Sequence, residues 1–304
     1  MTKASVPHRG EVGVLVIGES LIDVVTREGV AVEMPGGSPA NVALGLGRLG
    51  HRARFHTSIG PDARGTRIAE HLAGSGVIVT DESWTLQRTS VATARVRADG
   101  SAEYIFEIDG TIAAPRRRDE AVVHFGSISM FMHPGASTIE AFIEDLPRDV
   151  LVSMDPNIRP ALVGPRDAAV RRFERLLQRA DVVKLSDEDA AWLYPGASSG
   201  EVLDHLLRGS TRLVAITRGS GGAALATPTA RVALDAPFVL VADTIGAGDT
   251  FMAALLNVVT RDDSVLRNLS SEGLRSVGEA ATRAAAITVQ REGADLPWAD
   301  ELLA

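Results

Sequence analysis

Short apolar runs alternate along the chain with stretches in which apolar residues recur at helical spacing. Such runs, bounded by Gly, Pro or Asp, are typical of buried strands, whereas apolar positions three and four residues apart are typical of amphipathic helices. The pattern predicts strands over residues 12–17, 54–59, 121–125, 150–154, 181–185, 212–216 and 237–242. It predicts helices over residues 39–49, 66–74, 139–146, 167–179, 187–193, 201–207, 248–259 and 279–289.

Most of the predicted strands are apolar throughout, and a helix follows nearly every one of them. This order is typical of a parallel sheet that helices cover on both faces, which gives three layers. We therefore expect an α/β fold that forms a single domain over residues 1–304. Sheets of this class bind ligands at the carboxyl ends of their strands, so polar residues directly after a strand are the first candidates for a site.

Two segments depart from this order because their polar and apolar residues alternate. They cover residues 91–96 and 102–108, and Ala98-Asp99-Gly100 between them is typical of a tight turn. The pair predicts a β-hairpin with one face exposed to solvent. We expect the segments around residues 19–35 and 91–112 to form a small β-sheet lid on the main domain.

The composition is that of a globular protein, and it narrows the classes of partner. With 304 residues, 45% of them hydrophobic, the chain is long enough for a sizeable core. Its net charge of −8 disfavours nucleic acid and anionic membranes as partners. It has no cysteine, no apolar leader-like segment and no apolar run long enough to span a membrane, so we expect a cytoplasmic location.

The strongest candidate for chemistry is Asp243-Thr-Ile-Gly246-Ala247-Gly248-Asp249, between a predicted strand and a predicted helix. Small residues at a helix start let backbone amides approach an anion closely, and the helix dipole favours negative charge there. Asp249 at this point can accept a proton from an attacking hydroxyl. The alternative is an ordinary first-turn carboxylate, with glycines that serve a tight turn.

Further positions near the N-terminus have the chemistry to hold a polyol. Gly36 and Gly37 expose backbone amides directly before a predicted helix, for which Ser38 is the expected N-cap. Asn41 offers both a donor and an acceptor, and Asp23 offers an acceptor after the first strand. The structural alternatives are a glycine turn that leads into a helix and a solvated loop aspartate.

Two loops in the middle of the chain also follow predicted strands. Asn157 and Arg159 project from a proline-stiffened loop, where the Arg159 guanidinium either binds a phosphoryl or other polar group or is a surface charge. Lys184 precedes Ser186 and Asp189, which have the spacing of a capping box. The functional alternative places Ser186 near phosphate and lets Asp189 hold Mg²⁺ through water.

Thr217, Gly219 and Gly222 follow the next predicted strand, in a turn that suits either a phosphate or ribose group or a simple hairpin. The chain has no P-loop sequence, and its two lysines are Lys3 and Lys184. If the protein binds phosphate, it must therefore do so mainly through backbone amides, helix termini and arginine.

Taken together, these motifs resemble those of the ribokinase-like (PfkB) carbohydrate kinases, and most of all those of fructokinases. The resemblance extends from the first strand to the last helix, and the whole series in one order is far more specific than any single motif. The residues that carry it are Asp23, Gly36, Gly37, Asn41, Asp155, Asn157, Arg159, Lys184, Ser186, Thr217, Gly219, Gly222 and the stretch from Asp243 to Asp249.

The resemblance implies a ribokinase-like fold and a role for each residue. Asp249 would be the general base on the accepting hydroxyl, and the amides of Gly246, Ala247 and Gly248 would form an anion hole for the transferring phosphoryl. The substrate-binding residues would be Asp23, Gly36, Gly37, Asn41, Phe106, Asn157 and Arg159. The nucleotide-binding residues would be Lys184, Ser186, Thr217, Gly219, Gly222 and Gly248.

The resemblance also implies ATP and Mg²⁺ as cofactors, together with K⁺ as the monovalent cation that many members use. Asp189 would hold Mg²⁺ through water, Asp243 would lie near the monovalent cation, and residues 284–293 would flank the adenine. The chain departs from the family at two of these places. The family often has Asn-x-x-Glu where this chain has Ser186 to Asp189, and Ile245 replaces a frequent threonine.

The identity of the sugar is inferred from the predicted lid. Residues 104–111 look like the lid of fructokinases, in which Phe106 would close over the sugar. Relatives that phosphorylate 2-keto-3-deoxygluconate typically carry a Tyr-Arg pair there, and residues 104–113 contain no arginine. We therefore expect transfer from ATP to D-fructose, which gives fructose 6-phosphate. Lids in this family often pair between subunits, so we expect a homodimer formed through the lid.

Three other functions compete with this one. A kinase for 2-keto-3-deoxygluconate or ribose would use the same residues. A non-catalytic sugar-binding regulatory protein would keep the fold, but the intact Asp249 and glycines count against it. An NAD enzyme would need Gly45-Leu-Gly47-Arg-Leu-Gly50, and that pattern lies inside a predicted helix instead of between a strand and a helix.

Overall fold

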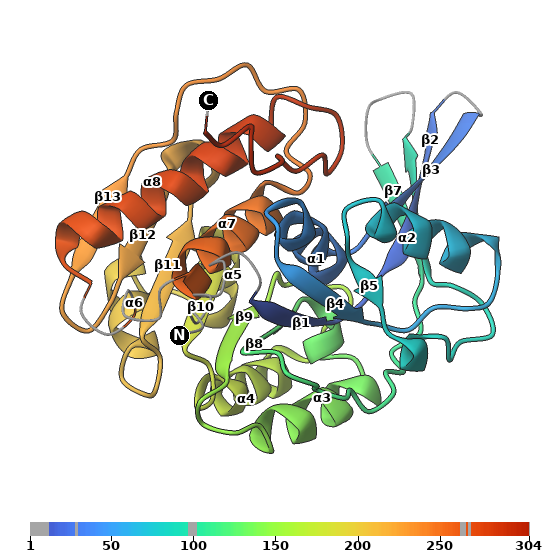
Figure 1. Cartoon of the computed structure of the whole chain (residues 1–304), viewed down its shortest axis with the longest axis horizontal. Coiled ribbons are helices and arrows are strands. Elements are labelled where there is room, and N and C mark those ends of the chain that lie inside the picture. Colours follow the sequence, from blue (N-terminus) through green and yellow to red (C-terminus); the bar gives the residue numbers. More distant parts are fainter. Residues whose placement is uncertain (1–11, 28–29, 97–101, 262–265, 267–268, 304) are drawn as a thin grey trace, which may run out of the picture.

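A large sheet lies between two layers of helices, and a smaller sheet projects beside it (Figure 1). The structure, a computed structural model, describes residues 12–27, 30–96, 102–261, 266 and 269–303. Within these residues the large sheet has nine strands in the order β13-β12-β11-β10-β9-β8-β1-β4-β5. The predicted three-layer α/β/α fold with a mainly parallel sheet is therefore confirmed.

The parallel strands of the large sheet lie close to where the apolar runs predict them. Six of the predicted strands are present, with every bound within three residues of the prediction. The parallel strands are β1 (Gly13–Ile17), β4 (Arg52–His56), β5 (Ile78–Val79), β8 (Val122–Gly126), β9 (Leu151–Asp155), β10 (Val182–Ser186) and β11 (Leu213–Thr217). Two antiparallel strands, β12 (Ala223–Ala226) and β13 (Arg231–Leu234), complete one end.

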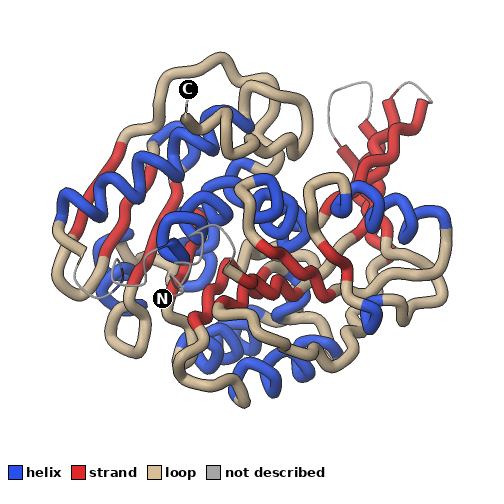
Figure 2. The backbone as a smooth tube through the Cα atoms, viewed as in Figure 1, coloured by secondary structure: helices blue, strands red, loops and turns tan. Residues whose placement is uncertain are grey.

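The strand predicted over residues 237–242 is wrong. This segment is part of the long loop between β13 and α7 (Figure 2), and the side chains of Phe238 and Leu240 are 98% and 84% exposed. An apolar run forms a strand only where a sheet edge pairs with it and buries it. The chain leaves the sheet after Leu234, and the Ala242 amide donates instead to the carbonyl of Val289 (2.8 Å).

The parallel strands are buried on both faces, and for this reason their sequences are continuous apolar runs. Val14 and Val16 of β1 face one helical layer, and Leu15 and Ile17 face the other. The first layer contains α1 (Ser38–Arg48), α2 (Ala63–Ala73), α7 (Ala247–Arg261) and α8 (Ser271–Thr288). The second contains α3 (Gly135–Glu144), α4 (Arg166–Leu177), α5 (Asp187–Leu193) and α6 (Ser199–Leu206).

The small sheet contains the predicted hairpin. Its order is β3-β2-β6-β7, formed by β2 (Leu21–Arg27), β3 (Val30–Gly36), β6 (Val91–Val96) and β7 (Ala102–Glu107). The strand register aligns Asp23, Met34, Ala92 and Phe106 in one row on one face. The other face, with the buried side chain of Ile22, packs against α2. The turn predicted at residues 98–100 lies outside the described residues.

The order of the large sheet reverses beside β1. The chain passes from β1 to β4 and β5 on one side, and then from β8 to β11 on the other. Open parallel sheets bind ligands at such a switch point, outside the carboxyl ends of the strands. The loops after β1, β8, β9, β10 and β11 all meet at this edge. No helix in the described part of the chain is long and apolar enough to cross a membrane.

Candidate active site

Asp249 lies in the first turn of α7 and is almost completely buried. Its Oδ1 accepts a hydrogen bond from Ser38 Oγ (2.6 Å), and its Oδ2 accepts one from Asn41 Nδ2 (2.8 Å). Asn41 thus meets Asp249 across 208 positions of sequence. Ser38 and Asn41 are three residues apart on α1, so they share a face of that helix.

The expectation that Ser38 caps α1 is wrong. The cap residue is Gly37, no side chain caps the helix, and the Ser38 hydroxyl points at Asp249. Ser38 is therefore a residue of the candidate site that the sequence did not reveal. The signal that could have shown it is its spacing from Asn41, because residues i and i+3 of a helix face the same partner.

The turn before α7 exposes backbone amides at the same place. Gly246 has a φ of 77°, which favours glycine, and a Cβ there would lie 2.8 Å from Ala294 Cβ. The Ala247 amide donates to Thr244 O (3.3 Å) and the Thr250 amide to Gly246 O (2.8 Å). The Gly248 and Asp249 amides belong to the first helical turn, where intrahelical acceptors are lacking. This helix end is a ready site for an anion.

A buried ion pair lies beside this turn. Lys184 Nζ donates to Asp155 Oδ2 at 2.9 Å, and both side chains are at most 5% exposed. A Cβ on Gly248 would lie 2.8 Å from Lys184 Nζ, so the ammonium fills the space that a side chain at this position would need. Burial opposes a charge on Lys184, but the carboxylates of Asp155, Asp189 and Asp249 outweigh it and raise its pKa. The site therefore contains a fixed positive charge next to the helix N-terminus.

Asp23 and the two glycines form the second part of the site. A Cβ on Gly36 would overlap Asp23 Oδ2, and a Cβ on Gly37, where φ is 106°, would lie 2.7 Å from Glu19 O. At Gly37 the contact is with backbone, so only glycine fits there, whereas a side chain at position 36 would displace the Asp23 carboxylate. Burial raises the pKa of Asp23 to about 6, although the charge of Arg159 opposes the shift. A carboxylate of this kind is a strong acceptor for sugar hydroxyls.

The loop after β9 brings Asn157 and Arg159 to the same edge. Arg159 Nη1 donates to Asn157 Oδ1 (2.8 Å), and the backbone N–H of Asn157 donates to Asp155 Oδ1 (3.3 Å). Asn157 has a φ of 33°, in the left-handed region that asparagine tolerates better than most residues. The charge of Arg159 opposes the rise in the pKa of Asp23, so the loop lies near enough to the small sheet for the two charges to interact.

Ser186 and Asp189 form the capping box whose spacing the sequence shows. Ser186 Oγ accepts from the Asp189 amide (2.9 Å), and Asp189 Oδ2 accepts from the Ser186 amide (2.9 Å). Asp189 Oδ1 accepts from the Ile158 amide (2.7 Å). No group of three or more His, Cys, Asp or Glu in the described part of the chain could hold a metal. Mg²⁺ is commonly held by one or two carboxylates together with nucleotide phosphates. Asp189 is buried and both of its oxygens already accept from backbone amides, so it could reach such an ion only through a water molecule.

The remaining predicted residues lie at the same edge but apart from Asp249. Thr217 ends β11 and is paired in register with Ser186. Gly219 and Gly222 lie in the turn between the antiparallel strands β11 and β12, so this turn is also the hairpin that the sequence offered as an alternative. Asp243 accepts from the amides of Ile245 (3.1 Å) and Gly293 (3.0 Å), and thereby joins the two loops beside Gly246.

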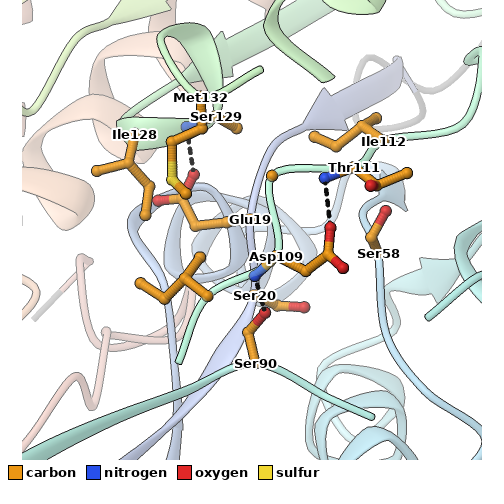
Figure 3. Close-up of a pocket in the computed structure, with 12 residues that line it drawn as sticks. Glu19, Ser20, Ser58, Ser90, Asp109, Thr111, Ile112, Ile128, Ser129 and Met132 are labelled. Carbon is orange, nitrogen blue, oxygen red and sulfur yellow. Dashed lines mark hydrogen bonds between the residues drawn. The ribbon is translucent and has the colours of Figure 1, made fainter. Parts of the chain in front are cut away.

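A separate pocket lies at the root of the small sheet, where its strands join the large sheet (Figure 3). None of the residues predicted for the site lines it. The Glu19 carboxylate points toward the loop after β8 and accepts from the Ser129 amide (3.1 Å). Burial raises the pKa of Glu19 to about 7, against the hydrogen bonds from Ser127 and Ser129.

A carboxylate beside exposed helix amides, at the switch point of a parallel sheet, suits a class of enzyme that transfers an anionic group to a hydroxyl. Comparison with known proteins identifies the class, because residues 10–301 match the model of the pfkB family carbohydrate kinases. The chain therefore belongs to the pfkB family, and the predicted resemblance and enzyme class, a carbohydrate kinase, are confirmed.

Several similar proteins are named fructokinases. The chain is 32% identical over 280 residues to a fructokinase of Rhizobium leguminosarum bv. trifolii, with 86% of each chain covered. Its fold matches the fructokinase of Xylella fastidiosa with bound ATP, with a TM-score of 0.82, 25% identity and coverage of 97% and 98%. It also matches a fructokinase double mutant of Vibrio cholerae O395 bound to fructose, ADP and potassium, with a TM-score of 0.79, 26% identity and coverage of 93% and 94%. The ribokinase-like fold is thus confirmed.

Proposed function

We propose that the protein is a fructokinase that transfers the γ-phosphoryl of ATP to D-fructose and yields fructose 6-phosphate. The observation that carries the proposal is the position of Asp249, between the polar face of α1 and the N-terminal amides of α7. A hydroxyl that displaces Ser38 or Asn41 from this carboxylate would lie next to an anion site. Phosphoryl transfer needs this juxtaposition, because positioning and charge stabilisation dominate the reaction.

In the proposed mechanism, Asp249 accepts the proton of the attacking hydroxyl. The sugar binds to Asp23, the amides of Gly36 and Gly37, Asn41, and the loop of Asn157 and Arg159, and the small sheet with Phe106 closes over it as a lid. The amides of Gly246, Ala247 and Gly248 bind the transferring phosphoryl, for which the Ala247 amide gives up its long hydrogen bond (3.3 Å) to Thr244 O. Residues of the β10 and β11 ends bind the nucleotide, namely Lys184, Ser186, Thr217, Gly219 and Gly222.

Two cations complete the proposal. When bound with ATP, Mg²⁺ would neutralise charge on the nucleotide phosphates, and Asp189 would hold it through water. Asp243 would support a monovalent cation through the loops that it joins, as its bonds to the amides of Ile245 and Gly293 suit. Fructose is favoured over 2-keto-3-deoxygluconate because residues 104–113 contain no arginine for a carboxylate. The homodimer and the cytoplasmic location stay predictions.

The test is sugar-dependent ADP release with Mg²⁺–ATP, measured for fructose, ribose, 2-keto-3-deoxygluconate and a panel of other sugars. Fructose should give the highest kcat/KM, and Asp249→Asn should lower kcat by about 10²–10⁴-fold because it removes the base and keeps the shape. Asp167→Asn, which changes another first-turn aspartate, on α4, is the matched control and should retain full activity. A higher kcat/KM for 2-keto-3-deoxygluconate would refute the sugar, and an active Asp249→Asn would refute the base.

A further inference from the structure

The buried Asp155–Lys184 pair joins the two halves of the candidate site. Asp155 is the last residue of β9 and Lys184 lies in β10, the next strand of the sheet. Toward the acceptor side, Asp155 Oδ1 accepts from the Asn157 amide, at the start of the loop that carries Arg159. Toward the phosphoryl side, Asp155 Oδ2 holds Lys184 Nζ, which lies against Gly248. The Asp155 carboxylate thus contacts both the loop on the acceptor side and the lysine on the phosphoryl side.

A contribution to the stability of the fold does not by itself explain this buried ion pair. Removing two charges from water costs several kcal/mol per ion, and buried ion pairs are often no more stabilising than apolar residues of similar size. The carboxylates around the Lys184 ammonium indicate a role for it in binding an anion. Asp189 and Asp249 also act on Lys184, so without this cation the cluster would be purely negative where a phosphoryl group must bind.

Lys184 is also held in one place. The Lys184 side chain is 5% exposed, and its ammonium is fixed by Asp155 at 2.9 Å and occupies the space over Gly248 that only a glycine leaves open. Preorganised charge in a site without water stabilises a developing charge far better than a mobile surface lysine does. The chain has no P-loop lysine, so this is the lysine placed to serve that purpose.

We infer that Asp155 is a positioning residue for phosphoryl transfer, which holds the Lys184 ammonium against the anion-binding turn before α7. The inference rests on the proposed function and extends it to a residue without a substrate contact. Asp155 acts through Lys184: its charge keeps the ammonium beside Gly248 when the transferring group gains negative charge. Its loss should therefore lower kcat and leave sugar binding nearly unchanged.

The test is a double-mutant cycle on the full-length protein with Asp155→Asn, Lys184→Met and the double variant. Asparagine keeps an oxygen that can accept from the Asn157 amide, so it separates the charge from the loop contact. Each single variant should lower kcat by about 10²-fold, as for the loss of one oxyanion donor. The KM for the sugar should change less than about threefold, and the double variant should be no slower than Lys184→Met, because both changes remove one interaction.

Ser153→Ala is the matched control. Ser153 is a buried polar residue on the same strand that bonds to His124 Nδ1 (3.0 Å), and its loss leaves the ion pair intact. Its kcat should stay within about threefold of the wild type. If Asp155→Asn fails to fold, Asp155→Glu takes its place, because it keeps the charge of the pair but moves the ammonium away from Gly248, so kcat should still fall and the KM for the sugar should not rise.

Binding of a transition-state mimic gives a readout that a purely structural role would not alter. ADP lacks the transferring group, so Asp155→Asn should weaken its binding by less than about tenfold, whereas ADP with aluminium fluoride and sugar should bind about 10²-fold more weakly. Equal losses for both ligands, multiplicative effects in the cycle, or an unchanged kcat in Asp155→Asn would overturn the inference and leave the proposed function intact. A wild-type protein without sugar-dependent ADP release would overturn both.

Discussion

At the scale of single residues, three positions of the site are glycine because another group occupies the space that a side chain would need. Over Gly36 lies the carboxylate of Asp23, over Gly37 the backbone of Glu19, and over Gly248 the ammonium of Lys184. Two of these neighbours are charged groups with a proposed role. The glycines therefore do more than permit turns, because they give the functional groups their room.

Gly36→Ala tests the first of these contacts. The new methyl group overlaps Asp23 Oδ2 and should turn the carboxylate away from the sugar. Loss of one hydrogen bond to a charged group costs about 1.5–3 kcal/mol, so the KM for the sugar should rise about 10–100-fold, with kcat less affected. Steady-state kinetics check this. Gly200→Ala, where the nearest heavy atom to the new Cβ is 3.9 Å away, should match the wild type; an unchanged KM in Gly36→Ala would exclude Asp23 from sugar binding.

Glu19 should make stability depend on pH. Its folded-state pKa is about 7, above the ordinary 4.5, so the charged form is disfavoured by folding. The cost is absent below the unfolded pKa and complete above pH 7. Glu19→Gln should therefore raise the free energy of unfolding by about 3 kcal/mol at most at pH 8, and by less than about 1 kcal/mol at pH 5. Urea unfolding of both proteins at both pH values measures it. An equal gain at both values would show that charge is not the cause.

At the scale of elements, the sequence predicts helices and strands well where burial is continuous. The strands over residues 150–154 and 181–185 are each displaced by one residue in the structure, because their apolar runs match the buried width of the sheet. The segment 237–242 is also mainly apolar but forms a loop, since the chain has already left the sheet at this point. Composition shows that a run can form a strand, and only the tertiary fold shows whether a partner is present.

Helix α1 illustrates how an element holds distant parts of the site. Its first turn contacts Asp249, and Arg48 in its last turn holds the C-terminal segment. Arg48 Nη1 donates to Asp295 Oδ1 (2.7 Å) and to Leu296 O, and its guanidinium lies 5.1 Å from the ring centre of Trp298. The same segment provides Ala294, which packs against Gly246.

Arg48→Ala should loosen this segment and disturb the turn beside it. We expect a loss of about 2–3 kcal/mol in the free energy of unfolding, from charged hydrogen bonds and the cation–π contact. Hydrogen exchange over residues 293–303 should quicken. Arg231→Ala is the control, because its ion pair with Asp204 is exposed and screened by solvent, so its loss should change the stability little. Equal losses in both variants would show that Arg48 has no special role.

At the scale of the whole molecule, the sequence could not predict which distant residues meet. It identified Asn41 and Asp249 as candidates, but not the hydrogen bond between them, because that contact depends on how α1 and α7 pack. Lys184 and Asp155 likewise meet only because their strands are neighbours in the sheet. Ser38 was missed since a cap was the simpler local explanation for a serine at a helix start.

The exposed face of the small sheet is relevant to the predicted homodimer. Val30, Val32, Met34 and Phe106 lie on the same face as Asp23, and Val32 is 52% exposed. Apolar strands of this kind commonly pair with another chain. This supports the predicted homodimer through the small sheet.

Val32→Lys should convert this dimer to a monomer, because it places a charge in an apolar interface. Sedimentation velocity at micromolar concentration measures the change. Ile78→Lys, which changes another exposed apolar residue (64%), on the edge strand β5, should leave the dimer intact. A wild-type protein that sediments as a monomer, or a dimer that survives Val32→Lys, would contradict the prediction.

The two hydrogen bonds that Asp249 accepts have a consequence for the competing reaction, in which water replaces the sugar as phosphoryl acceptor. Ser38 and Asn41 each donate to one oxygen of the Asp249 carboxylate, so the proposed base is already engaged when an acceptor arrives. A single water molecule competes with both groups and adds few hydrogen bonds of its own, whereas a sugar with several hydroxyls can replace them. The same contacts that place the base would thus protect ATP from futile hydrolysis until a proper acceptor is bound.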